Sequence, residues 1–159
     1  PQPPAPTRPP GEVRRELGLA DRPYCVLAPG AGWAAKRWPA DAFRRVAELL
    51  AEAGCDVAVV GSAAEREVCQ RVAAAAPGAC VAAGRPLGEV VALLSEAGGV
   101  AANDSGIAHL AAALGRPTAA VFTGATDPKL CRPLGPPGKV AIFAPGVTPE
   151  EVAAAIGRV

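Results

Sequence analysis

A polar turn at Asn103–Gly106 is the strongest candidate for chemistry in this 159-residue sequence. It lies in the segment AANDSGIAHLAAALG, between a run of small residues and an Ala-rich stretch with helical character. A helix that starts there directs its unpaired amides and the positive end of its dipole toward the turn. Asp104, Ser105 and Gly106 therefore form a candidate diphosphate site without a P-loop lysine. Helix capping is an equally good explanation for Asp104 and Ser105. His109 stands alone among the Ala and Leu residues of this helix, and it also fits a hydrogen-bonded histidine of the core.

The loop APGAGWAAKRWP, residues 28–39, combines glycines with two cations. Gly30 lets the backbone approach a ligand closely, and Lys36 with Arg37 can bring positive charge to a phosphate. The alternative is a solvated basic loop over which the two tryptophans pack. This loop is the second candidate for phosphate binding.

The loop GSAAERE, residues 61–67, offers a carboxylate beside a glycine turn. Glu65 can accept hydrogen bonds from both ribose hydroxyls, as an acidic residue does in dinucleotide-binding folds, with Ser62 beside it. Glu67 lies two residues further along, in nearly the same register as Glu65, and is the alternative residue for this role. The alternative is a capping box, in which Ser62 and Glu65 only stabilise the start of a helix. A fourth loop, FTGATDP, is by itself a polar turn.

These loops connect short apolar runs and helical segments that alternate along the chain. Strands are predicted at 24–28, 55–60, 80–83, 99–102, 117–123 and 140–143. Helices are predicted at 39–53, 63–76, 87–97, 107–114 and 149–156, and the segment 124–138 is predicted to be a loop. Such strands pair in parallel through right-handed crossovers. The expected fold is α/β, a doubly wound Rossmann-like sheet of about six strands, whose ligands bind beyond the carboxyl ends of the strands.

The N-terminal stretch PQPPAPTRPP contains six prolines and almost nothing apolar. It predicts an extended linker, followed by a short helix at 11–20. We therefore expect two parts, with residues 1–22 as linker and short helix and residues 23–159 as the nucleotide-binding domain.

Charge and cysteine usage exclude several classes of function. Sixteen basic and fifteen acidic residues leave a formal charge of +1, so nucleic acid is not an expected partner. The five cysteines are scattered singly and only one histidine is present, so no metal site is expected. These thiols fit small buried side chains in a reducing compartment. Without an apolar run that spans a bilayer, the protein is expected to be cytoplasmic, with peripheral membrane contact at most.

Taken in order, the motifs PGAGWAAKRWP, VVGSAAERE and AANDSGIAHLAAALG resemble glycosyltransferase family 9, the bacterial ADP-heptose:lipopolysaccharide heptosyltransferases. The resemblance covers residues 24 to about 135. It implies half of a GT-B fold, in which two Rossmann-like domains face each other and the C-terminal one holds ADP-heptose. The missing N-terminal domain would bind the lipopolysaccharide core acceptor.

The resemblance also assigns roles to residues of this sequence. Lys36 would contact the donor phosphate and stabilise the leaving diphosphate, Glu65 would bind the ribose, the turn from Asp104 to Gly106 would hold the diphosphate, and His109 would lie one helical turn below it. The family is inverting and metal-independent and uses no cofactor. Its general base is attributed to the other domain, so this chain alone is expected to be inactive. The parent enzyme is expected at the inner face of the bacterial inner membrane.

Two other functions stay open on the sequence. One is a free-standing nucleotide-binding module without catalytic activity, and the other is half of a GT-B-like sugar-nucleotide epimerase. The sugar, the acceptor and the choice among ADP, UDP and GDP are likewise open.

Overall fold

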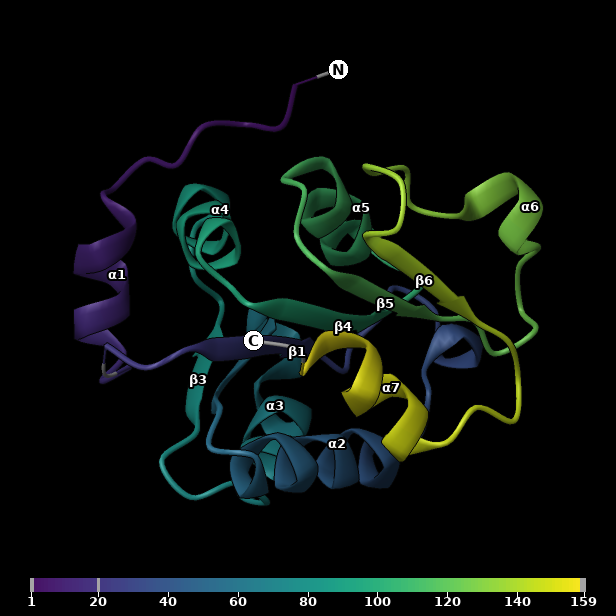
Figure 1. Cartoon of the computed structure of the whole chain (residues 1–159), viewed down its shortest axis with the longest axis horizontal. Helices are drawn as coiled ribbons and strands as arrows, with labels where there is room; N and C mark the ends of the chain where they lie inside the picture. The colour runs from purple at the N-terminus through teal and green to yellow at the C-terminus, as the bar shows by residue number, and fades with distance from the viewer. Residues whose placement is uncertain (1, 20, 158–159) are drawn as a thin grey trace.

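The structure, a computed structural model, describes residues 2–19 and 21–157. Its centre is a parallel sheet in the order β3-β2-β1-β4-β5-β6 (Figure 1). The strands are β1 (Tyr24–Ala28), β2 (Asp56–Gly61), β3 (Cys80–Ala83), β4 (Gly99–Asn103), β5 (Thr118–Val121) and β6 (Val140–Phe143). Every neighbouring pair is parallel. This order, with β1 and β4 as central neighbours, confirms the predicted doubly wound Rossmann-like fold.

Helices cover both faces of the sheet (Figure 1). One layer contains α2 (Ala40–Glu52), α3 (Arg66–Ala73) and α7 (Pro149–Ile156), and the other contains α1 (Pro10–Glu16), α4 (Leu87–Ser95) and α5 (Gly106–Ala113). The two core clusters divide in the same way between the faces. Because side chains alternate along a strand, β1 supplies Cys25 and Leu27 to one cluster and Tyr24 and Val26 to the other.

The amphipathic pattern of each helix decides which face it buries. In α2 the buried side chains are Phe43, Val46, Ala47 and Leu50, a three- and four-residue spacing that forms one stripe. The helix begins after Pro39, close to the predicted start. No helix in the described part of the chain is long and apolar enough to cross a membrane.

Some boundaries differ from the prediction. The predicted helix at 63–76 begins as a 3-10 turn, Ala63–Glu65, and its α-helix α3 ends at Ala73. The short N-terminal helix starts at Pro10 and ends at Glu16. The predicted loop at 124–138 contains a short helix, α6 (Pro128–Cys131), because Asp127 accepts a hydrogen bond from the Lys129 N–H and Pro128 suits the first helical position.

The five cysteines are free thiols, and the expectation that they are small buried side chains holds for three of them. Cys25, Cys55 and Cys69 are buried, while Cys80 and Cys131 are half-buried. Burial raises the pKa of the Cys69 and Cys80 thiols to about 11, which keeps both protonated and unreactive at neutral pH.

Candidate functional site

A cavity of about 630 Å³ opens at the carboxyl ends of β1 and β2 and beside the turn that follows β4. β1 and β4 are adjacent at the centre of the sheet, where the strand order reverses, which is the usual ligand site of a doubly wound fold. The cavity volume lies within the roughly 300–1,000 Å³ range of small-molecule pockets. It is lined by Gln2, Pro3, Pro4, Ala28, Gly30, Ala31, Gly32, Val60, Gly61, Glu65, Leu87, Ser105, Gly106, Ile107, His109, Leu110 and Ala113.

The start of α5 forms one part of the cavity wall, through Ser105 and Gly106. Ser105 occupies the N-cap position, but no side chain caps this helix, and the buried Ser105 Oγ has no hydrogen-bond partner among the described residues. The first amides of α5 therefore remain available, and the helix dipole favours an anion there. The predicted capping by Asp104 and Ser105 is absent, which leaves this helix end open to a ligand.

Asn103 ties the turn before α5 to the loop after β1. Its Nδ2 donates hydrogen bonds to the carbonyls of Pro29, at 2.9 Å, and Gly30, at 3.2 Å. Its Oδ1 accepts from the N–H of Trp38 at 2.9 Å. The side chain is buried with both ends of the amide in use. Asn103 thus fixes two of the candidate ligand loops relative to each other.

Lys36 and Asp104, predicted as separate phosphate ligands, are paired with each other. The Lys36 Nζ lies 3.1 Å from Asp104 Oδ2, and the Asp104 side chain is only 6% exposed. The Thr126 hydroxyl donates to the same oxygen at 2.6 Å. Neither Lys36 nor Asp104 lines the cavity itself, but Asp104 directly precedes Ser105, which does. The ion pair therefore lies beside the turn but outside the cavity.

Glu65 lies against Gly30 at the other side of the site. A Cβ on Gly30 would come 1.8 Å from Glu65 Oε2, so only glycine lets this carboxylate occupy its position. Glu65 Oε1 accepts a hydrogen bond from the Ser62 N–H at 2.8 Å, and the two residues form the predicted capping box. One oxygen of Glu65 therefore has a structural partner, while the side chain also lines the cavity. Ser62 itself does not line it.

The third side of the cavity is apolar and comes from α5. Ile107, Leu110 and Ala113 follow one another at three-residue spacing and line it together with His109. His109 is exposed, so the core-histidine interpretation is wrong. The apolar residues were missed as site residues, although their helical spacing was visible in the sequence.

Of the predicted site residues, the structure brings together Gly30, Glu65, Ser105, Gly106 and His109 around one cavity. Lys36, Ser62 and Asp104 lie outside its lining. Gln2, Pro3 and Pro4 also line the cavity, and no sequence signal indicated that the proline-rich stretch would do so. No group of three or more His, Cys, Asp or Glu side chains suited to a metal ion occurs within residues 2–19 and 21–157.

The sheet order and the ligand-sized cavity at its switch point define a Rossmann-like domain of the kind that forms one half of a GT-B glycosyltransferase. The chain belongs to glycosyltransferase family 9, the heptosyltransferases, whose family model matches residues 5–152.

Individual relatives agree with this membership. Lipopolysaccharide heptosyltransferase 1 of Pseudomonas aeruginosa is 41% identical over 121 residues, which cover 74% of this chain and 34% of that protein. The solved structure of Escherichia coli ADP-heptose lipopolysaccharide heptosyltransferase II has a TM-score of 0.83 and 27% identity, covering 92% of this chain and 49% of that one. The solved structure of Escherichia coli heptosyltransferase WaaC with ADP has a TM-score of 0.73 and 27% identity, and the match covers 95% of this chain and 49% of that one. The chain therefore spans about a third to a half of the relatives it matches.

Proposed function

We propose that this chain is the donor-binding domain of an inverting, metal-independent heptosyltransferase in lipopolysaccharide core synthesis, and that its cavity holds the ADP part of ADP-heptose. One observation carries the proposal: a single cavity at the sheet's switch point is lined both by the uncapped start of α5 and by the Glu65 carboxylate. A diphosphate suits the helix start, and a ribose suits the carboxylate.

The diphosphate would lie at Ser105 and Gly106, where the α5 amides donate hydrogen bonds to its oxygens. Lys36 is held beside this turn by Asp104 and adds a positive charge at short range. As the acceptor oxygen attacks the anomeric carbon, the bond from that carbon to the diphosphate oxygen breaks and negative charge grows on the leaving group. Lys36 and the helix start stabilise that charge, which lowers the barrier.

The nucleoside would extend from the diphosphate along the cavity. The ribose hydroxyls donate to Glu65, whose position depends on the absence of a side chain at Gly30. The apolar wall of Ile107 and Leu110 suits the flat face of a base. His109 lies on the same helix and contributes a polar group to the cavity.

The acceptor and the general base would come from a facing domain outside this chain. Inverting transfer requires an acceptor hydroxyl behind the anomeric carbon and a base within hydrogen-bond reach of its proton. We propose that the parent enzyme works in the bacterial cytoplasm, at the inner face of the inner membrane, where the lipopolysaccharide core acceptor would be presented to both domains.

A calorimetric panel of ADP, UDP and GDP, each measured in EDTA, tests the proposal. We expect ADP to bind in preference to the other two and to bind equally well with and without divalent metal. Absence of binding by all three nucleotides, or binding of ADP that EDTA abolishes, would contradict it.

A further inference from the structure

The proline-rich stretch before α1 is part of the cavity wall. Gln2, Pro3 and Pro4 line it, although α5 and the loop after β1, which also line it, are far away in sequence. In Figure 1 this stretch leaves α1, passes α4 and runs toward α5. Proline has a fixed φ and little backbone entropy to lose, so an extended proline segment needs few contacts to hold a defined course.

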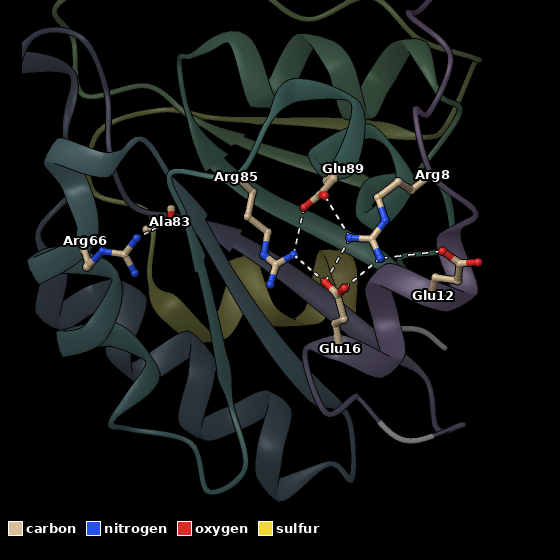
Figure 2. Close-up of polar contacts among 7 residues, drawn as sticks. All are labelled: Arg8, Glu12, Glu16, Arg66, Ala83, Arg85 and Glu89. Atoms are coloured by element: carbon tan, nitrogen blue, oxygen red, sulfur yellow. Dashed lines mark hydrogen bonds and ion pairs between the residues drawn. The ribbon is translucent and has the colours of Figure 1, made fainter.

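A ring of charges fixes this stretch to the body of the domain (Figure 2). Arg8 lies 2.7 Å from Glu16 and 3.0 Å from Glu89, and Arg85 lies 3.1 Å and 2.9 Å from the same two carboxylates. Positive and negative groups thus alternate around a closed ring, named here the charge ring. It joins the N-terminal stretch, α1 and α4.

The burial of Glu89 and the shared hydrogen bonds indicate that the charge ring is stronger than an isolated surface pair. The Glu89 side chain is only 13% exposed. Hydrogen bonds from Arg8 and then Arg85 lower the pKa of Glu16 to about 2 and also lower the pKa of Glu89. Each guanidinium binds two carboxylates, so the geometry is held from both sides.

A second contact lies next to the charge ring. The Thr7 N–H donates to the Gly88 carbonyl at 3.4 Å. A Cβ on Gly88 would come 2.3 Å from both Cγ2 and Oγ1 of Thr7, so the stretch packs directly on the first turn of α4. Leu87, in that same turn, lines the cavity. The N-terminal stretch and the first turn of α4, which carries the cavity residue Leu87, are therefore fixed together.

We propose that the charge ring is a positioning device for donor binding: it holds Gln2, Pro3 and Pro4 as a wall against the nucleotide base. This inference rests on the proposed function. The wall and the start of α5 serve different parts of the ligand. Loss of the wall weakens recognition of the base, while Lys36 and the α5 amides act on the diphosphate.

The first test is Arg8→Gln, with Arg15→Gln as the matched control. Arg15 is an exposed arginine of α1 with no ion pair among the described residues. If the wall is in place for only about a fifth of the time after Arg8→Gln, the apparent Kd for ADP rises about fivefold, while Arg15→Gln leaves it unchanged. An unchanged Kd for ADP in Arg8→Gln would overturn the inference.

The second test separates positioning from folding. Gly88→Ala favours the helix, because alanine is the better helix former, yet it displaces Thr7. We expect the melting temperature to be retained or raised while the affinity for ADP falls. A variant that keeps the affinity of the unaltered chain would contradict the role of this contact.

Photolabelling gives a readout that a merely structural role would not change. 8-Azido-ADP carries its reactive group on the base, and mass spectrometry of the labelled full chain locates the attachment. We expect label within residues 2–8 of the unaltered chain and its loss from that stretch in Arg8→Gln, but not in Arg15→Gln. ADP binding with label elsewhere would overturn the inference and leave the proposed function standing. Failure of the unaltered chain to bind ADP would overturn both.

Discussion

The Lys36 ammonium lies 3.1 Å from the Asp104 carboxylate, which is almost completely buried and also accepts a hydrogen bond from Thr126. This pairing changes the role expected for Asp104. A carboxylate is a poor direct partner for a diphosphate, because like charges repel, but it can hold a lysine at the edge of an anion site. Asp104 is therefore better understood as the group that orients Lys36 beside the start of α5.

Lys36→Ala is expected to weaken ADP binding by about 1–3 kcal/mol, the usual size of a charge-assisted hydrogen bond. Lys139→Ala is the matched control, because Lys139 is an exposed lysine just before β6. It therefore lies at the amino ends of the strands, whereas the cavity opens at their carboxyl ends. Calorimetry measures both affinities, and circular dichroism checks that both variants are folded. Equal affinities in the two variants would show that Lys36 does not contribute to ADP binding.

Gly30→Ala is expected to displace the Glu65 carboxylate, since the new Cβ would come 1.8 Å from Oε2. The carboxylate then loses its hydrogen bond from Ser62, which lowers the free energy of unfolding by about 0.5–1.5 kcal/mol. Urea denaturation measures this change.

Gly32→Ala provides the control for that experiment. A Cβ on Gly32 meets nothing within 4 Å, so this variant is expected to keep or slightly raise the stability of the chain. Equal losses of stability in both variants would show that the crowding at Glu65 is unimportant.

Much of the fold was predictable because its signals are local. The strand at 24–28 is buried on both faces, so it appears in the sequence as a continuous apolar run closed by a turn, and its observed bounds match the prediction. Helix α6 was missed because it has only the four residues Pro128–Cys131, within a segment rich in proline and glycine. Its start depends on a single cap by Asp127, which the sequence presents as an ordinary turn residue.

The site was only partly predictable, because its contacts join distant segments. The glycines and polar residues at the ends of β1 and β4 were found, since parallel strands bring their carboxyl ends to one edge. The pairing of Lys36 with Asp104 was not, because it depends on the 3-10 turn at Ala34–Lys36. The contribution of Gln2–Pro4 was also missed, since an extended proline segment has no periodic pattern to predict a packing partner.

Glu16→Gln is expected to destabilise the chain in a pH-dependent way. Hydrogen bonds from Arg8 and Arg85 lower the pKa of Glu16 from about 4.5 to about 2. Since the folded state has the lower pKa, the ionised carboxylate stabilises it fully above about pH 5, and this contribution is lost as the pH falls toward 2. The difference in melting temperature between the unaltered chain and Glu16→Gln should therefore shrink over that interval.

Glu67→Gln is the control for this titration, because Glu67 is exposed and has no ion pair among the described residues. We expect it to change the melting temperature little at any pH. A difference for Glu16→Gln that persists at pH 2 would contradict the assignment of the effect to its charge.

Glu65→Gln is expected to reduce the preference of the site for an intact ribose. A carboxylate that accepts from both ribose hydroxyls contributes about 1.5–3 kcal/mol for each such bond, and a glutamine of the same shape keeps an acceptor but loses the charge. The measurement compares the Kd of ADP with that of 2′,3′-dideoxy-ADP in both proteins. The ratio should be large for the unaltered chain and should fall at least about fivefold in Glu65→Gln, equivalent to about 1 kcal/mol. Glu67→Gln tests the neighbouring carboxylate of similar register, which does not line the cavity, and should leave the ratio unchanged. A ratio that falls in Glu67→Gln and not in Glu65→Gln would assign ribose recognition to Glu67.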